Sequence, residues 1–535
     1  MLDYDPTHAT KRRVKATPPA QVDVAIVGAG LGGLMAGARL AQAGQSVAIF
    51  DPHYVAGGCC TMFSRGGPRS RRNFDIGLHY IGDCGPDGGI PTLLREVGIE
   101  LAYAELVPDG FDTLVFPELE FRIPKGWDAY QERLLAHFPR AHRGISRYMR
   151  FLHEIDHMMR ASSRHKPGMR LAWEALSRGR LASRFLNGTL ADLLDTCTDD
   201  PLLRAVIAGQ SGDYGLPPSK VSAALHGGLV NHYFKGAYYP VGGGQVIADR
   251  LADTIEAHGG SVHLRRGIAQ ILVEDGRAVG VRTEVYKGQE YTVQAQTVIS
   301  AADLPLTLDT LLPPEALDDS WRARRPQLEM AAALYICCLN VRGDMRSRGM
   351  RNGNYWQFDG TDMETFYAAR DLQPRGCYIT AATLKDPDSP HHAPAGEDSV
   401  EVMTVLPGDP TLWGVEPDAL INWKYKKSAR YQEHKQRIED DLIGRLDRLF
   451  PGSAANVTFR ESATPMTHSR YTRATDGTGY GLAATPTQFM QRRPGYRGPV
   501  DGLYLAGAST RAGHGVVGSL MSGKNSALRI LRDTA

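Results

Sequence analysis

The amino-acid sequence predicts an α/β protein in which one α/β domain is interleaved with a mixed-sheet domain and a helical lobe. A buried strand, a glycine-rich turn and a helix follow one another over residues 22–43, which is the order of a βαβ unit. Residues 261–303 alternate apolar and polar side chains around an Asp-Gly turn, as antiparallel strands do. Residues 126–236 carry long helical patterns with few strand signals.

The chain has 535 residues, several times the length of a typical single domain, and this length allows an inserted lobe. Its hydrophobic and charged fractions, 42% and 22%, are those of a globular protein. We expect the α/β domain to be assembled from three separate segments. The expected segments are a mobile leader at 1–20, the α/β domain at 21–125, 237–310 and 481–535, the helical lobe at 126–236, and the mixed-sheet domain at 311–480.

The turn near the amino terminus is the most informative motif. The strand at 22–27 leads into Gly28-Ala29-Gly30-Leu31-Gly32-Gly33, and a helix is predicted over 34–43. In this Rossmann-type arrangement Gly28 permits the tight turn, Gly30 lets the backbone approach a pyrophosphate, and Gly33 lets helix and strand pack closely. The positive end of the helix then faces the phosphates. The motif therefore predicts a dinucleotide site, with a purely structural glycine turn as the alternative.

An acidic residue completes the dinucleotide motif. A second strand at 46–50 delivers Asp51, whose carboxylate can accept hydrogen bonds from the ribose hydroxyls of an adenosine. The pair Gly57-Gly58 follows. Two glycines in this place resemble the extension that separates FAD-binding chains of the amine oxidase and phytoene desaturase superfamily from NAD dehydrogenases. The resemblance implies FAD, and an ordinary Gly-Gly turn is the alternative for this pair alone.

The carboxyl-terminal segment supplies a second glycine cluster. A strand at 502–506 is followed by Gly507-Ala508-Ser509-Thr510 and by Gly513-His514-Gly515-Val516-Val517-Gly518, and a helix is predicted over 519–531. This run resembles the A-G-A-S-T-x-P-G-x-G end of phytoene desaturases, although Ala512 replaces its proline and Ala508 stands where more distant members carry an acid. The helix start would face the flavin pyrimidine. The residues that the resemblance places at the flavin are Gly507, Ala508, Gly515, Val516 and Val517.

Five internal stretches resemble carotenoid isomerases and retinol saturases, and they spread the likeness over most of the chain. This family is implied to use FAD, in some members with NAD(P) as electron partner, and to add, remove or relocate hydrogens along polyene or unsaturated lipid chains. The strand around Ile268 is implied to bring main-chain groups to the adenine, with a structural hairpin as the alternative. The five stretches are 73–82, 212–218, 239–244, 383–387 and 479–482.

Four side chains are candidates for the proton transfer that accompanies such chemistry. His79 is the first, because histidine titrates near neutral pH and its motif is expected beside the flavin. Tyr80 and Asp75, in the same motif, are second choices, and His514 in the terminal glycine cluster is another candidate. Each has a structural alternative, since His79 could bond only a backbone group and Asp75 could cap a turn.

Composition and charge argue against several other classes. The formal net charge of +2 gives no reason to expect a nucleic-acid partner. Seven cysteines without C-x-x-C spacing, together with the lack of a signal-peptide pattern, indicate a reducing, cytoplasmic location. The pair His391-His392 lies in a proline-containing loop, and no metal site is predicted.

One segment is locally basic. Residues 140–184 hold eleven lysines and arginines against three acids, interleaved with apolar side chains. Two interpretations stay open: an amphipathic surface that contacts an anionic bilayer and passes a lipid inward, or a solvated helical face packed on the core. No apolar run reaches the roughly 18 residues of a membrane-spanning helix.

Three functions are compatible with these motifs. The first is a flavoenzyme that saturates, desaturates or isomerises carbon–carbon double bonds of a long apolar substrate. The second is an amine or amino-acid oxidase on the same fold, for which we identify no acidic or aromatic clamp for the amine. The third is a non-catalytic prenyl or lipid escort, which would not need both glycine clusters intact. The motifs therefore favour the flavoenzyme.

Overall fold

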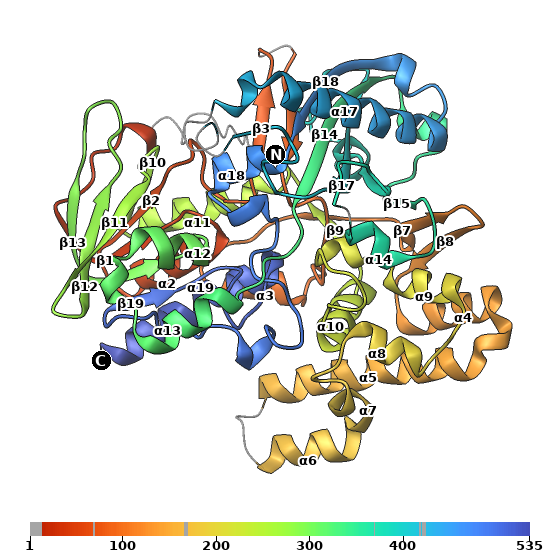
Figure 1. The fold of residues 1–535 in the computed structure, drawn as a ribbon, viewed down its shortest axis with the longest axis horizontal. Helices are drawn as coiled ribbons and strands as arrows, with labels where there is room; N and C mark the ends of the chain where they lie inside the picture. Colours follow the sequence, from red (N-terminus) through yellow and green to blue (C-terminus); the bar gives the residue numbers. More distant parts are fainter. Residues whose placement is uncertain are drawn as a thin grey trace.

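A computed structural model describes residues 13–67, 70–164, 169–368, 370–416, 419 and 424–534. An α/β body lies at one side of the molecule, a second sheet with its covering helix lies at the other, and a helical lobe extends below the second sheet (Figure 1). The predicted α/β fold is confirmed.

The first sheet contains the amino-terminal strand and is mostly parallel. Strand β1 pairs with β2 on one side and with β13 on the other, and β13 also pairs with β19 from the carboxyl terminus. The predicted Asp275-Gly276 hairpin is confirmed between β11 and β12. The strands are β1 (Gln21–Val27), β2 (Val47–Asp51), β10 (Ser261–Leu264), β11 (Ile268–Glu274), β12 (Arg277–Thr283), β13 (Thr292–Ser300) and β19 (Leu503–Leu505).

Three helices pack on one another beside this sheet. Helix α2 (Leu31–Gln42) contacts α11 (Gln245–Ala257) on one side and α19 (Gly515–Asp533) on the other. Their contact is close because small residues meet there: a Cβ added to Gly523 of α19 would lie 2.2 Å from the carbonyl oxygen of Gly32 in α2. Helix α19 is therefore packed closely against the start of α2, next to the first glycine turn.

The second sheet has the strand order β18-β14-β17-β16-β15-β7-β8. Helix α17 (Ala429–Leu449) covers it with its apolar side, formed by residues such as Ile438, Leu442 and Leu446. The strands are β7 (Asp109–Phe116), β8 (Leu119–Pro124), β14 (Leu334–Arg342), β15 (Asn354–Phe358), β16 (Gly376–Thr380), β17 (Glu397–Val405) and β18 (Val457–Ala463).

Two smaller sheets lie between these bodies, and the placement of β7 and β8 differs from the sequence prediction. Strands β3 (Met62–Arg65) and β4 (Arg72–Asp75) form a hairpin, and β9 (Ala237–Pro240) lies between β5 (Ile81–Gly82) and β6 (Tyr103–Glu105). Strands β7 and β8 fall inside the expected α/β segment 21–125 but lie in the second sheet, because β7 pairs in parallel with the distant β15. No local sequence pattern predicts the pairing of β7 with β15.

The expected mobile leader is wrong from residue 13 onward, while residues 1–12 lie outside the described part. The Arg13 side chain is only 1% exposed. Its guanidinium bonds Asp253 at 2.8 Å and Glu256 at 3.0 Å, both on α11. The acidic side chains of α11 therefore hold Arg13, at the start of the described chain, against the α/β body that contains the first sheet.

Among the described residues, the seven α-helices that lie between β8 and β9 in the sequence form the lobe. The apolar face of α5, with Ile145, Tyr148 and Leu152, is buried and packs on α10. Within the described residues, no helix has both the length and the apolar character needed to cross a membrane. The helices are α4 (Trp127–His137), α5 (His142–Arg164), α6 (Met169–Arg178), α7 (Arg180–Arg184), α8 (Leu190–Asp195), α9 (Pro201–Ala208) and α10 (Ala223–Phe234).

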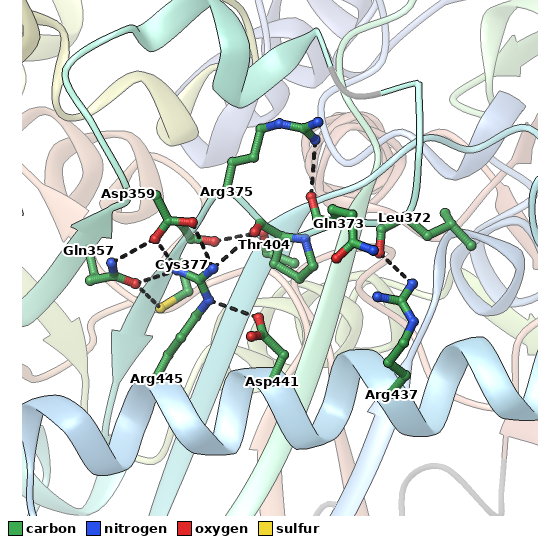
Figure 2. A network of polar contacts seen from close by, with 12 residues as sticks. Gln357, Asp359, Leu372, Gln373, Arg375, Cys377, Thr404, Arg437, Asp441 and Arg445 are labelled. Carbon is green, nitrogen blue, oxygen red and sulfur yellow. Dashed lines mark hydrogen bonds and ion pairs between the residues drawn. The ribbon is translucent and has the colours of Figure 1, made fainter.

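A buried arginine ties α17 to the second sheet (Figure 2). The guanidinium of Arg445 donates to Asp359 at 2.6 and 2.8 Å, to Asp441 at 2.8 Å, to the side-chain oxygen of Gln357 at 2.7 Å and to the carbonyl of Pro374 at 2.9 Å. All these acceptors converge on one planar cation, which suits the fixed fork of arginine donors.

Replacing Arg445 with alanine is expected to lower the free energy of unfolding by about 2–3 kcal/mol, which is less than for a fully buried ion pair because both partner carboxylates are part-exposed. The measurement is the urea midpoint. Arg437 of the same helix, which bonds only the carbonyl of Leu372 at 2.8 Å, is the control and should cost less than about 1 kcal/mol. Equal midpoints for the two alanine variants would contradict the assignment.

Candidate active site

One cavity of about 830 Å³ runs between the first sheet and the second, and it gathers residues from both ends of the chain. Of the fourteen residues predicted to contact the cofactor, only Gly33 and Val517 do not line it. Those that do are Gly28, Gly30, Leu31, Gly32, Asp51, Gly57, Gly58, Ile268, Gly507, Ala508, Gly515 and Val516.

The glycine turn is shaped by close backbone approaches. Gly28 has a φ of +100°, a region that favours glycine. A Cβ on Gly33 would lie 2.1 Å from the carbonyl oxygen of Gly28, so Gly33 packs beneath the turn and not in the cavity. A Cβ on Gly30 would meet no atom closer than 4.0 Å, which leaves room over this residue for a ligand.

Asp51 ends β2 at the edge of the same turn. Its carboxylate accepts hydrogen bonds from the backbone N–H of Ala29 at 2.7 Å and of His53 at 2.8 Å. Burial raises the pKa of Asp51, and these two hydrogen bonds oppose that shift. The acid is therefore fixed in place beside the position where the motif predicts a ribose.

Two helix starts open into this one cavity. Helix α2 begins after Gly30 and α19 begins after His514, and neither residue caps the helix with a side-chain hydrogen bond. The first-turn N–H groups and the positive dipole ends are thus free for a ligand. Helix α19 starts at Gly515, four residues earlier than predicted, so Gly515, Val516 and Val517 form its first turn. These features fit a dinucleotide whose pyrophosphate lies at the start of α2 and whose flavin-like ring system lies at the start of α19.

The internal motifs from distant parts of the sequence converge beside the cavity. Strands β5 and β9 join the first motif to the third. Lys385, from the fourth motif, donates to the carbonyl oxygen of His79 and to Thr380 Oγ1. Tyr480, from the fifth, lines the cavity and donates to the carbonyl of Gly212 in the second at 2.7 Å. The motifs therefore contact one another although they are scattered in sequence: the first and the fifth line the cavity, and the other three support them from behind.

Both candidate histidines are held in the neutral form. Burial and the charge of Lys385 lower the pKa of His79 to about 3, and burial with the charge of Arg493 lowers the pKa of His514 to about 3. Three of their ring nitrogens have no hydrogen-bond partner among the residues that the structure describes. These are Nδ1 and Nε2 of His79 and Nδ1 of His514. A neutral imidazole in such a site is a poor store for a proton.

Asp75 has a structural place in the first internal motif. It is buried and accepts hydrogen bonds from the Tyr239 hydroxyl and from the backbone N–H of Gly244 at 3.0 Å. Burial raises its pKa. The carboxyl therefore joins β4 to the glycine turn before α11.

Tyr80 bridges two carboxyl groups. Its hydroxyl oxygen lies 2.9 Å from Oδ2 of Asp112 and 2.5 Å from Oδ2 of Asp213. A hydroxyl has one hydrogen and can donate to only one of them, so the other short contact requires a protonated carboxyl that donates to the tyrosine. Asp112 already accepts from Gln210 at 2.7 Å and Asn354 at 2.9 Å. The proton therefore belongs on Asp213, which has Tyr80 as its hydrogen-bond partner.

The electrostatics agree with this assignment. Burial, and then the charge of Asp112, raise the pKa of Asp213 well above its ordinary value, and burial raises the pKa of Asp112 as well. The two carboxyls therefore titrate as a pair that retains one proton at neutral pH. Asp213 is only half-buried and follows Gly212, the carbonyl partner of Tyr480 at the cavity.

Aromatic rings enclose the Tyr80 bridge. Tyr233 stacks on Tyr80 with ring centroids 4.5 Å apart, and Tyr378 lies 6.2 Å from it and 4.5 Å from Trp356. The Tyr378 hydroxyl and Trp356 Nε1 are buried and meet no hydrogen-bond partner in the described chain. The bridge thus sits in a largely apolar chamber.

Sequence reasoning missed Asp112, Asp213 and Lys385 as site residues. Asp213 and Lys385 stand inside quoted motifs, where the acid of Gly212-Asp213-Tyr214 was a usable signal. Asp112 had a weaker signal, an acid within the otherwise apolar strand β7. Its role depends on β15 and the turn after α9, which carries Gln210, lying close to Asp112, and no local pattern shows this.

Comparisons with known proteins agree with this architecture. The model of the family described as flavin containing amine oxidoreductase matches residues 31–338 and 425–531. Among solved structures, an oxidoreductase from Methanosarcina mazei aligns over 95% of this chain and 100% of its own, with TM-score 0.60 and 18% identity. Putrescine oxidase bound to putrescine aligns over 96% of this chain and 100% of its own, with TM-score 0.60 and 17% identity. At these identities the structures show the fold alone.

Curated relatives are similar over nearly the whole chain. The all-trans-retinol 13,14-reductase of Danio rerio is 27% identical over 520 residues, covering 91% of this chain and 82% of the relative. Prolycopene isomerase 1, chloroplastic, of an Oncidium hybrid cultivar is 24% identical over 536 residues, covering 97% and 85%. The predicted resemblance to retinol saturases and carotenoid isomerases is thereby confirmed. Because the family model covers most of the chain and its glycine clusters meet in one cavity, the chain belongs to the flavin containing amine oxidoreductase family.

Proposed function

We propose that this protein is an FAD-dependent enzyme that saturates or isomerises carbon–carbon double bonds of a long apolar polyene. The observation that carries the proposal is that all five retinol-saturase-like motifs contact one another, and that the first and the fifth of them line the cavity together with the two open helix starts. The relatives named for a retinol reductase and a prolycopene isomerase support this substrate class. Asp51 would bond the adenosine ribose, and the first turns of α2 and α19 would hold the pyrophosphate and the flavin ring.

When bound, the flavin supplies or accepts a hydride at one carbon of the double bond. The protein must then supply a proton to the neighbouring carbon for saturation. We assign that proton to Asp213, because burial and the charge of Asp112 raise its pKa and keep it protonated at the Tyr80 bridge, among aromatic rings. His79, which is neutral and buried, would shape the apolar wall. Water is kept out by the surrounding rings, which prevents loss of the hydride to solvent.

The test of the proposed function is product mass spectrometry after anaerobic incubation with a polyene mixture, with the flavin oxidised in one arm and reduced in the other. NAD(P)H is supplied in a third arm, since a nicotinamide is the electron donor that we propose. A product heavier by one hydrogen pair establishes saturation, and an isobaric product with a shifted retention time establishes isomerisation. An unchanged mixture in all arms, with the flavin bound, would overturn the proposal.

We further propose that the helical lobe contacts an anionic membrane surface. Three large apolar side chains of α5 and α6 face solvent: Met169 is 92% exposed, Trp173 60% and Met159 54%. Basic residues border them, and a shallow depression on the lobe is lined by Arg147, Arg150, Arg180 and Arg184. Of the basic residues predicted there, Lys166 and the side chains of Arg164 and Arg170 lie outside the described part.

Replacing Trp173 with serine is expected to weaken binding to vesicles of anionic phospholipid by about tenfold, since an indole that enters the interface loses its apolar contact. Co-sedimentation measures the effect. Val285, 68% exposed on the first domain, is the control, and its serine variant should bind as the unmodified protein does. Binding that ignores both Trp173 and the lipid charge would contradict a membrane-facing lobe.

A further inference from the structure

The cavity continues beyond the glycine clusters. There it is bounded by β3, β18, α17 and α18 (Pro465–Thr472), which lie together at the top of the molecule (Figure 1). Met62 and Phe63 of β3 and Ala463 of β18 give this part an apolar wall. An elongated apolar molecule that reached the flavin site through this part of the cavity would leave its outer terminus near α17.

The charged side chains of the cavity are almost all paired. Arg65 binds Glu461 through two hydrogen bonds of 2.6 and 2.5 Å, and Arg473 lies 3.2 Å from Glu284. The two aspartates that line the dinucleotide end also have partners: Asp51 bonds the N–H of Ala29, and Asp303 bonds the N–H of Leu306 and Thr475 Oγ1. The cavity-lining cations without an ion pair or a hydrogen bond, within the described part of the chain, are Lys426 and Lys435.

These two lysines stand in a locally positive field. Burial, and then the charges of Arg470 and Lys435, lower the pKa of Lys426. The acid nearby, Glu461, is already neutralised by Arg65. Unpaired like charges repel one another across a partly desolvated wall, and an anion placed between them removes that cost.

A third polar group without a partner in the described chain lines the same cavity. His468 of α18 lines the cavity and is only 7% exposed, and its Nε2 meets no hydrogen-bond partner among the described residues. Burial lowers the pKa of His468 to about 4, so the ring is neutral and can donate one N–H. A buried polar atom without a partner is uncommon in a folded protein, and a ligand that accepts its hydrogen bond would satisfy it.

We propose that Lys426 and Lys435, in the cavity that His468 also lines, form an anion subsite that receives the carboxylate at the outer end of an elongated apolar substrate. This inference rests on the proposed function and specifies its substrate class as polyenoic acids. The apolar wall between the subsite and the flavin site binds the chain, and the two ammonium groups select its end. Because Lys426 is exposed and Lys435 half-buried, the subsite contributes selectivity and a salt-dependent affinity more than a large binding energy.

The experiment compares two probes that share a polyene and differ at one end, all-trans-retinoic acid and all-trans-retinol. Equilibrium binding to the holoenzyme is measured by quenching of tryptophan fluorescence, without turnover. The acid should bind more tightly than the alcohol, and its affinity should fall as salt is raised. In the double variant Lys426→Gln/Lys435→Gln the acid should bind about tenfold more weakly, as expected for two part-exposed charge pairs, while the alcohol changes little.

The matched control is the double variant Lys424→Gln/Lys427→Gln, which removes two exposed lysines that flank Lys426 but do not line the cavity. It should bind both probes as the unmodified holoenzyme does. Equal affinity for acid and alcohol in every variant would overturn the anion subsite while leaving the polyene function standing. Failure of both probes to bind would overturn the proposed function and the subsite with it. A loss of NADPH affinity, and not of acid affinity, in the Lys426/Lys435 variant would assign the lysines to the electron donor and also overturn the proposal.

Discussion

Replacing Gly33 with alanine is expected to yield a colourless protein that is destabilised by roughly 3 kcal/mol, because the new methyl group would overpack the turn. Its Cβ would lie 2.1 Å from the carbonyl oxygen of Gly28 and 3.1 Å from the Cβ of Ala301. Neither the backbone carbonyl nor the strand can move without displacing the glycine turn. Flavin absorbance of the purified protein and its thermal midpoint measure the two effects.

A second glycine separates loss of flavin from loss of folding. Gly30 lines the cavity, and the protein atom nearest to an added Cβ would be the Cα of Gly58, at 4.0 Å. Gly30→Ala should therefore keep the stability of the apoprotein and still lose flavin, because the methyl group occupies the space for the pyrophosphate. Gly360, with no atom within 4 Å of an added Cβ, is the neutral control. Full flavin content in both Gly30→Ala and Gly33→Ala would contradict the assignment of the dinucleotide site to this turn.

Replacing Asp213 with asparagine is expected to lower turnover by about 10²–10³-fold, the usual contribution of a positioned general acid, while flavin content stays unchanged. Asp213 holds its proton at neutral pH because burial and the neighbouring Asp112 raise its pKa. Activity should fall as pH rises through the pKa of this pair, because the proton is then lost before reaction. The asparagine variant should lose that descending limb of the pH profile.

The bridge itself offers two further measurements. Tyr80→Phe removes the hydroxyl between Asp112 and Asp213, and it should shift the same limb of the pH profile toward higher pH, because the Tyr80 hydrogen bond lowers the pKa of both carboxyls. Asp213→Glu should recover part of the turnover. In the apoprotein, the infrared carbonyl band of protonated carboxylic acids should be present and should lose the contribution of one carboxyl in Asp213→Asn, the remainder coming from groups such as Asp249 and Glu401, whose pKa burial raises to about 8. An unchanged band and pH profile would transfer the proton-supplying role to another group.

Local patterns predicted the parts of this protein whose geometry is set by neighbouring residues. The turn at Gly28 depends on its own positive φ, and the Asp275-Gly276 hairpin depends on two residues with φ values of 47° and 76°. Such requirements are written in the sequence because few residue types satisfy them. The expected resemblance, the βαβ unit and the second glycine cluster follow from the same kind of constraint.

The parts that could not be predicted depend on which elements become neighbours. Asp112 joins the proton-holding pair because β7 pairs with β15, which brings Asn354 to it. Lys426 and Lys435 matter because nearby acids already have partners, a property of the folded cavity and not of either lysine's surroundings in sequence. His79 was the leading candidate because of its residue type, yet its protonation follows from burial, which a motif does not report.

The joining of the two ends of the chain has a consequence for biosynthesis. Strand β19 pairs with β13 and α19 packs on α2, so that one wall of the cavity is made by residues that leave the ribosome long after the glycine turn. A nascent chain that already displays a finished Gly28–Gly33 turn still lacks the helix start at Gly515. Flavin can therefore be enclosed only after residues 503–533 have been synthesised, and until then the half-built pocket is exposed to chaperones and proteases.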